Sequence, residues 1–250
     1  MTDSNFDTLE LREPALREAA LLAALPAHVA AAQRTPAFAE ILHGVDAAAV
    51  NSRAALARLP VTRKHELLER QKQHRATDPF GGFSAVGWRA LGSARHARHV
   101  FQSPGPIYEP GGHAADYWRF GRALHAAGFR PGDLVHNSFS YHLTPAGSMF
   151  ETAALAVGCT VFPGGVGNTE LQLQAMAELR ADAYAGTPSF LRILLEKADE
   201  TGVSLPALCK ATVGGEAFPA ALRDALRARG IEAYQSYGTA DLGLVAYETP

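Results

Sequence analysis

The stretch Ile231-Glu-Ala-Tyr-Gln-Ser-Tyr-Gly-Thr-Ala-Asp-Leu-Gly-Leu-Val-Ala-Tyr-Glu248 joins an apolar segment to a polar one that contains glycine. Its first four residues, 231–234, are predicted as a buried strand. Polar and glycine residues then follow from Gln235 to Asp241. Open α/β sheets bind ligands where their strands end. An ordinary strand-to-loop connection explains the same pattern, because glycine and aspartate are common in turns.

Strands and helices alternate in the chain before this stretch, from Asp116 onward. The predicted strands are 134–139, 159–162, 183–186 and 211–213, and a helix follows each. This alternation predicts an α/β fold with a mostly parallel sheet flanked by helices. Right-handed crossovers bring successive strand ends to one edge of the sheet. The segments expected at this edge are 138–142, 164–167, 186–189, 214–217 and 237–241.

Capping signals and apolar spacing predict the helices between the strands. One helix is expected over 117–127, and Thr169 with Gln172 matches a capping box at the start of another. Thr187 followed by Pro188 predicts a third start. The helix that starts at Thr169 carries Leu171, Ala175, Met176 and Leu179. In the helix that starts at Thr187-Pro188, the residues expected to face inward are Leu191, Leu194, Leu195 and Ala198.

The first part of the chain, residues 1–115, is predicted to differ from the rest. Helices are expected over 13–33, interrupted at Pro26, and over 36–43. Residues 81–112 are rich in glycine and proline and predict an irregular segment, either a functional loop or a surface connection.

Composition excludes several classes of function. A formal net charge of -2 gives no basic surface for nucleic acid. The apolar region 15–32 contains charged residues and Pro26, so no membrane span is expected. Acidic residues occupy the N-terminus, where a signal peptide would carry basic ones. Two distant cysteines, Cys159 and Cys209, argue against a disulfide framework. A cytoplasmic protein is therefore expected.

Several enzyme motifs are absent from the sequence. There is no G-x-G-x-x-G after a strand, no G-x-x-x-x-G-K-[ST] and no G-x-S-x-G. Their absence argues against a dinucleotide enzyme, a Walker-type NTPase and an α/β-hydrolase. His96 and His99 have the spacing of metal ligands on one helix face, but no cysteine or acid accompanies them, and solvated histidines are favoured.

Two polar segments carry candidate chemistry. In Gly214-Gly215-Glu216-Ala217, the glycines allow a flat ligand against the backbone, and the acid can accept from an amine or hydroxyl. Asp241 is a candidate Mg²⁺ ligand, a solvated acid or a helix cap. Thr239 could donate to a phosphate or satisfy a turn. Tyr237 could pack against a base or an acyl group, or lie in the core.

Two motifs together resemble a known family. Tyr237-Gly-Thr-Ala-Asp-Leu-Gly243, preceded by Gly214-Gly-Glu-Ala-Phe-Pro219, is similar to the adenylate-forming enzymes, and most similar to their phenylacetate–CoA ligase branch. Four further segments resemble that branch in order and spacing, so that the likeness extends over residues 59–248. These segments are 59–64, 130–136, 158–161 and 187–189.

The resemblance implies an activity, its cofactors and its partners. Such enzymes activate a carboxylic acid with Mg·ATP, form an acyl-adenylate with release of pyrophosphate, and transfer the acyl group to CoA. ATP, Mg²⁺ and CoA are thus implied, with a small carboxylic acid as substrate. Residues 116–250 would form the nucleotide- and acyl-binding core. A homodimer is one candidate assembly.

The resemblance also implies roles for individual residues. Gly215, Glu216 and Ala217 would contact adenine, and Gln235, Ser236, Tyr237 and Gly238 would form the wall beneath it. Thr239 would serve both nucleotide binding and catalysis, and Asp241 would be catalytic and hold Mg²⁺. The residues implied for an aromatic acyl pocket are Phe139, Tyr141, Gly186, Thr187 and Pro188.

Three departures from the family pattern leave alternatives open. The phosphate loop, SSGTTGKP in the family, corresponds to Gln102-Ser-Pro-Gly-Pro-Ile107, which has no lysine and contains two prolines without amide donors. Ala240 replaces a hydroxyl residue, and Asp241 is shorter than glutamate. The family's ribose-binding aspartate and its small lysine-bearing domain would lie beyond Pro250. A nucleotide- or acyl-binding module without adenylation, or an unrelated Rossmann-like transferase, are the alternatives.

Overall fold

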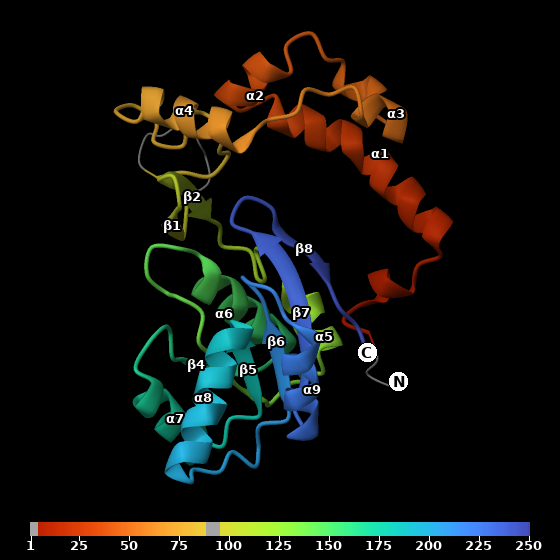
Figure 1. The fold of residues 1–250 in the computed structure, drawn as a ribbon. Helices are drawn as coiled ribbons and strands as arrows, with labels where there is room; N and C mark the ends of the chain where they lie inside the picture. Colours follow the sequence, from red (N-terminus) through yellow and green to blue (C-terminus); the bar gives the residue numbers. More distant parts are fainter. Residues whose placement is uncertain (1–4, 89–95) are drawn as a thin grey trace. The chain divides into compact units, whose positions relative to one another are not determined.

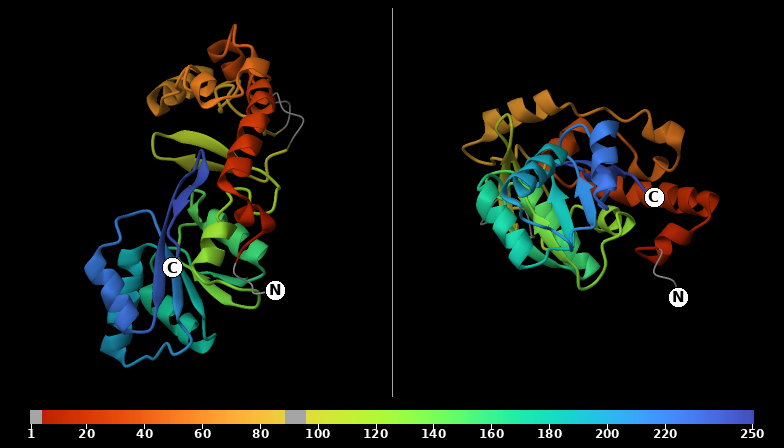
Figure 2. Two further views of the ribbon diagram at one scale, coloured as in Figure 1. Left: turned by 90° about the vertical axis from the view of Figure 1, so that its right-hand side faces the viewer. Right: turned by 60° about the horizontal axis from the view of Figure 1, so that its bottom comes forward.

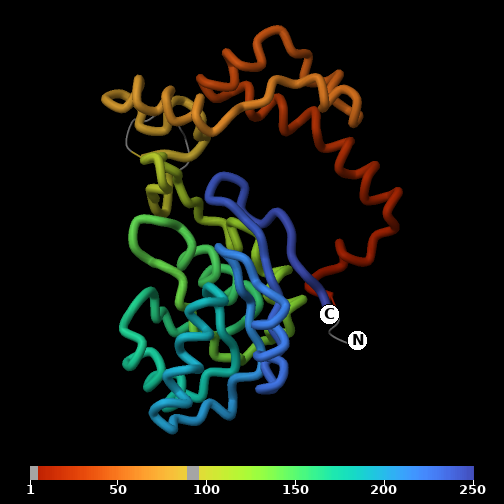
Figure 3. Tube along the Cα trace, viewed as in Figure 1, coloured from red at the N-terminus to blue at the C-terminus, as the bar shows by residue number. Residues whose placement is uncertain are grey.

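The computed structural model describes residues 5–88 and 96–250. Contacts divide the chain into two compact units, Asp7–His113 and Ala114–Pro250, with Phe6 belonging to the second (Figure 3). Each unit contains its own β-sheet.

Helices make up most of the unit Asp7–His113. Helix α1 runs unbroken through Pro26, so the expected interruption is wrong; alanines and leucines on both sides, which favour helix, sustain it. Val29, Leu42, Val50 and Ala55 form a small core. The helices are η1 (Thr8–Leu11), α1 (Pro14–Ala32), α2 (Pro36–Ile41), η2 (Ala47–Ala49), α3 (Arg53–Leu56) and α4 (Lys64–His74).

Helix α1 also bears on the expectation that no segment spans a membrane. Among the described residues, it alone has the length and apolar composition of a membrane-spanning helix, despite its charged residues. Only 6% of its most apolar window is buried. Core helices and leader segments meet the same criteria, so this is weak evidence for a span.

A β-hairpin lies within the segment that was expected to be irregular. Strands β1 (His99–Ser103) and β2 (Ile107–Gly111) pair antiparallel. The buried side chain of Gln71 orders the hairpin by bonding both backbone groups of Tyr108, each at 2.9 Å. Because His99 lies in a strand, the idea that His96 and His99 share a helix face is wrong. Residues 89–95 of this segment lie outside the described part of the chain.

The unit Ala114–Pro250 has the expected α/β fold. Its six-stranded sheet has the order β4-β3-β5-β6-β7-β8, in which the first five strands are parallel and β8 is antiparallel to β7 (Figure 1). The strands are β3 (Leu134–Asn137), β4 (Thr160–Pro163), β5 (Ala183–Gly186), β6 (Lys210–Val213), β7 (Glu232–Thr239) and β8 (Gly243–Tyr247).

Helices cover both faces of this sheet. Helices α5 (Gly121–Ala126) and α6 (Ala146–Val157) lie on one face; α7 (Thr169–Glu178), α8 (Pro188–Thr201) and α9 (Ala220–Ala228) lie on the other (Figures 1 and 2). The chain leaves β3 toward β4 and then returns past β3 to β5. The strand order therefore reverses between β3 and β5, which is where open α/β sheets bind ligands.

The structure confirms one expected helix face and moves the start of another helix. All four predicted inward residues of α8 are buried: Leu191, Leu194, Leu195 and Ala198. In α7, Met176 is buried together with Leu173, whereas Leu171 and the C-cap residue Leu179 are exposed. Helix α5 begins at Gly121 rather than at 117, because Asp116 and Arg119 adopt positive φ and interrupt helical geometry.

Strand β7 is longer than expected. Residues 235–239, which were predicted as a loop, continue the strand, and 236–239 pair with β8, with a bulge between Tyr237 and Gly238. The antiparallel partner supplies the backbone hydrogen bonds that a solvated loop would have taken from water. The polar residues of this stretch therefore lie on a hairpin that runs past the end of β6.

Candidate functional site

The loops that follow β3 and β5 meet at the point where the strand order reverses. The Ser138 amide donates to the Ala185 carbonyl at 2.7 Å and joins the two strand ends. Phe139 and Tyr141 follow β3, Gly186 ends β5, and Thr187 and Pro188 lead directly into α8. The residues expected for the acyl pocket are thus placed on adjacent loops. Thr187 also caps α8 by accepting from the Phe190 amide.

The backbone at Gly186 is fixed by a buried tyrosine. A Cβ atom at Gly186 would lie 2.1 Å from the Tyr184 hydroxyl oxygen, so only glycine fits there. The same hydroxyl donates to the Thr187 carbonyl at 3.2 Å. Burial raises the pKa of Tyr184, so that the phenol stays protonated and keeps its donor. Tyr184 therefore holds the start of the loop after β5.

Aromatic side chains support the loop after β3. Phe139 stacks on Phe150 with ring centroids 4.2 Å apart, and Phe150 lies 4.7 Å from the Phe120 ring. The Tyr141 hydroxyl accepts from Asn137 Nδ2 at 2.8 Å, and burial raises the pKa of Tyr141. Phe139 and Tyr141 are consequently held in place at the start of this loop as two uncharged aromatic side chains.

The glycine turn after β6 lies against these two loops. A Cβ atom at Gly215 would lie 3.8 Å from Thr187 Cγ2 and 4.0 Å from Phe139 Cε1. Gly215 has a φ of +81°, which favours glycine. A Cβ at Gly214 would lie 2.8 Å from the Ser236 carbonyl oxygen. Three turns that are distant in sequence therefore converge around Gly215.

Glu216 is exposed, and both its carboxylate and its backbone carbonyl accept hydrogen bonds. Its Oε1 accepts from the Ser189 amide at 2.7 Å, a bond in the first turn of α8, where negative charge is favoured. Its carbonyl accepts from Gln235 Nε2 at 2.9 Å. One carboxylate oxygen of Glu216 thus accepts a hydrogen bond from α8, and Gln235 links the turn after β6 to β7.

Two residues that the sequence did not indicate stabilise the polar half of β7. The Gln235 amide donates to Glu248 Oε2 at 2.7 Å, and Arg223 donates to Glu248 Oε1 at 2.9 Å. Burial alone would raise the pKa of Glu248, but the bonds from Arg223 and the Gln235 amide lower it below its ordinary value. Arg223 also lies 4.3 Å over the Phe218 ring. No sequence motif relates Arg223 to Glu248.

Side chains of β7 alternate between the core and solvent. Tyr237 is 61% exposed, which excludes a place in the core, whereas Ser236 is buried and its hydroxyl makes no hydrogen bond within the described residues. Tyr237 can therefore face a ligand, and Ser236 contributes backbone rather than side chain to this strand. A Cβ at Gly238 would lie 2.4 Å from Phe120 Cζ, so the hairpin packs directly on Phe120.

Thr239 and Asp241 lie at the tip of the β7–β8 hairpin. Thr239 Oγ1 accepts from the Leu242 amide at 3.1 Å, the turn role considered above, and its hydroxyl hydrogen can still be donated. The side chain of Arg119 donates to the Leu242 carbonyl. Asp241 is exposed. The turn around Gly215 contacts β7 at Gln235, whereas Thr239 and Asp241 lie farther along, at and beyond the end of the strand.

Asp241 fits a particular mode of Mg²⁺ binding. Within residues 5–88 and 96–250, no three His, Cys, Asp or Glu side chains gather as a metal site. Mg²⁺ is commonly bound by one or two carboxylates, with nucleotide phosphates and water completing the shell. An exposed carboxylate on a hairpin tip is compatible with that arrangement.

Ser103, which echoed the family's phosphate loop, belongs to the other unit. Its hydroxyl is buried and donates to Glu109 Oε1 at 2.9 Å across the β1–β2 hairpin. Pro104 and Pro106 in the turn between these strands have no amide hydrogens. The Ser103 hydroxyl thus serves the hairpin itself.

A hollow of about 560 Å³ lies at the opposite edge of the sheet, beside the amino ends of β6 and β7. Its charged lining residues, Asp199 and Arg229, are paired with each other at 3.0 and 2.5 Å. It contains none of the expected site residues.

The AMP-binding enzyme family matches residues 115–250. The chain is 32% identical over 209 residues to the phenylacetate-coenzyme A ligase of Aromatoleum evansii, covering 80% of this chain and 44% of that protein. It is 29% identical over 222 residues to the phenylacetate-coenzyme A ligase of Thermus thermophilus, covering 84% and 47%. The chain therefore spans about half the length of these curated relatives.

A solved structure supports the same fold. The chain superimposes with a TM-score of 0.82 and 23% identity on an open conformation of 2-hydroxyisobutyryl-CoA ligase in complex with 2-HIB-AMP and CoA, covering 94% of this chain and 53% of that one. At this identity the similarity shows the fold alone. Because the family match extends over more than half of the sequence, the chain belongs to the family of AMP-binding enzymes.

Proposed function

We propose that this chain forms the nucleotide- and acyl-binding part of an acid–thiol ligase. The reaction is ATP-dependent adenylation of an aromatic carboxylate, an aryl or arylacetic acid, followed by transfer of the acyl group to CoA. One observation carries the proposal: Gly215, in the turn assigned to adenine, lies next to Thr187 and Phe139, which are assigned to the acyl pocket. An acyl-adenylate requires its two halves to be bound side by side.

The reaction requires mainly that the protein align the reacting groups. A carboxylate oxygen attacks the α-phosphorus of ATP, and pyrophosphate leaves; the CoA thiolate then attacks the carbonyl carbon, and AMP leaves. Both steps are accelerated when the reactants are held in line and developing charge is stabilised. The protein's part in the first step is therefore to place the carboxylate against the α-phosphate.

Each candidate residue has a place in this scheme. The backbone of Gly215 to Ala217 would lie along the adenine, and the exposed Tyr237 with Gln235 and Gly238 would form the wall beneath it. Thr239 would donate its hydroxyl hydrogen to a phosphate oxygen. Asp241 would hold Mg²⁺, which supplies charge neutralisation for the phosphates.

The residues assigned to the acyl pocket support the aromatic substrate class. Phe139 is stacked on Phe150, and Tyr141 is a neutral phenol whose pKa burial raises further. Stacked aromatic rings favour an aromatic guest, and a neutral phenol avoids repulsion with a carboxylate. An aryl or arylacetic acid satisfies both conditions.

The test is carboxylate-dependent release of pyrophosphate from Mg·ATP, with the corresponding CoA thioester as the second product. We expect release with aromatic acids and little with short aliphatic acids. If no acid triggers release while nucleotide still binds, the chain is a binding module. The replacement of the family's phosphate loop by a turn with two prolines and no lysine favours that second candidate. Failure of ATP to bind at all would instead favour a transferase.

The proposal includes small-molecule partners, namely the acid, ATP and CoA, and a cytoplasmic location. A homodimer is also part of it. Size-exclusion chromatography with light scattering measures the mass of the assembly and tests that component separately.

A further inference from the structure

An exposed glycine loop after β4 is held from below by buried polar side chains. The loop comprises Gly164 to Gly167, in which Val166 is 57% exposed. Beneath it lie Gln172, only 3% exposed, and His136, 1% exposed. Burying a polar group costs free energy unless its hydrogen bonds are made. The hydrogen-bond partners of Gln172 and His136 therefore indicate what these buried side chains stabilise.

The carboxamide of Gln172 makes every hydrogen bond that it can. Its Oε1 accepts from Ser138 Oγ at 2.8 Å and lies 2.7 Å from His136 Nε2. Its Nε2 donates to the carbonyls of Gly165 at 2.9 Å and Gly167 at 2.6 Å. With two donors facing the oxygen and two acceptors facing the nitrogen, only one orientation of the amide fits.

His136 completes the anchor from β3. Because Gln172 Oε1 can only accept, His136 donates from Nε2. Burial lowers the pKa of His136, which keeps the ring neutral, and the ring stacks on Phe162 at 5.2 Å. A Cβ at Gly164 would lie 2.8 Å from Gln172 Oε1 and 2.9 Å from His136 Nε2, so the loop rests directly on this pair.

The same loop touches the candidate acyl pocket. The Gly165 amide donates to the Asn137 carbonyl at 3.0 Å, and a Cβ at Gly165 would lie 4.0 Å from the Tyr141 ring. Asn137, which is fully buried, donates from Nδ2 to the Tyr141 hydroxyl at 2.8 Å and to the Gly147 carbonyl at 2.9 Å. Gln172 is thereby connected to Tyr141 through the loop and through Asn137.

We propose that Gln172 is a positioning residue for the acyl pocket, holding the Gly164–Gly167 loop against Tyr141 and so setting which carboxylate fits. The inference rests on the proposed function. A role in core packing alone would not need this arrangement, because an exposed loop adds little to the core, whereas each buried polar group beneath it must keep a hydrogen-bond partner. Because all four hydrogen bonds of the Gln172 amide are made, the amide instead fixes the position of the loop.

The experiment compares two ligands on the purified chain by calorimetry: AMP, and a phenylacetyl sulfamoyl-adenosine that mimics the acyl-adenylate. The variant Gln172→Met keeps the length of the side chain and removes all four hydrogen bonds. We expect it to weaken binding of the acyl mimic about 10-fold, because the two loop carbonyls lose the donor that holds the loop against Tyr141. AMP binding should change less than about 2-fold.

Two further variants keep the test decisive. Gln174→Met makes the same substitution two residues along α7 at an exposed glutamine, and it should leave both affinities unchanged. If Gln172→Met fails to fold, Gly165→Ala disturbs the loop alone. Its added Cβ meets open space apart from the Tyr141 ring, and a φ of +68° strains the backbone. It should also weaken the acyl mimic selectively.

The outcomes separate this inference from the function beneath it. A wild-type chain that binds neither ligand overturns both. A wild-type chain that binds both ligands, with Gln172→Met and Gly165→Ala weakening them equally or not at all, overturns the positioning role and leaves the proposed function standing.

Discussion

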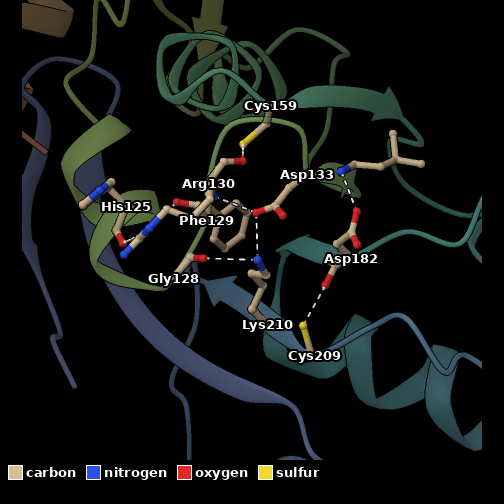
Figure 4. A network of polar contacts seen from close by, with 10 residues as sticks. His125, Gly128, Phe129, Arg130, Asp133, Cys159, Asp182, Cys209 and Lys210 are labelled. Carbon is tan, nitrogen blue, oxygen red and sulfur yellow. Dashed lines mark hydrogen bonds and ion pairs between the residues drawn. The ribbon is translucent and has the colours of Figure 1, made fainter. Parts of the chain in front are cut away.

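The two edges of the α/β sheet are built in different ways. At the amino edge, charged side chains bond to each other and to nearby backbone: Asp133 Oδ2 accepts from Lys210 Nζ at 2.8 Å and from the Arg130 amide at 2.6 Å (Figure 4). Lys210 also donates to the Gly128 carbonyl at 3.2 Å. Asp182 accepts from the Leu134 amide at 2.8 Å. Each of these bonds ties one strand or turn to another.

At the carboxyl edge, the buried polar groups are neutral and support exposed turns. The Gln172 amide donates to the backbone of the Gly164–Gly167 loop, Asn137 donates to the Gly147 carbonyl in the first turn of α6, and the turn at Gly215 to Ala217 is exposed. The Cys159 thiol at the amino edge is no candidate for chemistry either, since burial raises its pKa to about 11 and keeps it protonated and unreactive. The comparison teaches that the amino edge contributes stability, whereas the carboxyl edge offers a surface to ligands.

The largest expected effect on stability comes from a substitution at the amino edge of the sheet. Lys210→Met leaves Asp133 without its cation in a site where the two side chains are only 15% and 18% exposed. The loss of one partner from a buried pair should lower the free energy of unfolding by about 3 kcal/mol, measured by urea denaturation. Lys197→Met, at surface pairs with Glu170 and Glu200, is the control and should cost less than about 0.5 kcal/mol. Equal effects of the two substitutions would refute the contrast.

The next effect belongs to the carboxyl edge. Gly238→Ala would place a methyl group against Phe120 and 2.7 Å from the Gly243 carbonyl oxygen, at an estimated cost of about 2 kcal/mol in unfolding free energy. It should also weaken AMP binding, because the hairpin must shift. Gly230→Ala meets no atom within 4 Å and strains only the backbone, so it should leave AMP binding unchanged. Intact AMP binding in Gly238→Ala would argue against a role for the hairpin.

The pH dependence of stability tests the buried anchor of the carboxyl edge. Burial lowers the pKa of His136 below 6.5, so its contribution is fully present above that pH and is lost as the pH falls toward the folded-state pKa. The free energy of unfolding should decrease below pH 6.5 by at most about 1.4 kcal/mol per pH unit from this group. His136→Phe should flatten that decrease, while His142→Asn, at an exposed histidine, should not. An unchanged slope in His136→Phe would contradict the assignment.

The smallest effect concerns Asp116, which precedes α5. Burial raises the pKa of its carboxyl group, so the folded state loses stability as the pH rises from 3.8 through the raised pKa. Asp116→Asn can still accept from the Gly121 amide through its own oxygen and carries no charge. We expect it to stabilise the chain by roughly 1 kcal/mol at pH 7, with the difference vanishing below pH 3.8. A difference that stays constant with pH would exclude the carboxyl group as its source.

Local signals predicted much of the fold. The Thr187-Pro188 pair marks the start of α8, and the spacing of its leucines matches its buried face. These features are predictable because they depend on neighbouring residues along one element. The strand order that brings Gly215 beside Phe139 was expected only in outline, from the crossover rule.

Tertiary partners explain what the sequence could not predict. Gln172 matched a capping box with Thr169, but Asn168 is the cap residue, and the Gln172 side chain turns to His136, 36 residues away. Residues 235–239 extend β7 because β8 pairs with them. The Gln172–His136 contact joins residues far apart in sequence, and no local pattern encodes it.

The central claim, that the carboxyl edge binds the adenylate, is tested most directly by hydrogen–deuterium exchange of the chain with and without the acyl sulfamoyl-adenosine. We predict that peptides covering 214–218 and 234–242 become protected on binding, while those covering 130–133 and 204–210 do not change. Protection confined to the amino edge, around the hollow lined by Ser204 to Pro206 and Arg229, would contradict the account.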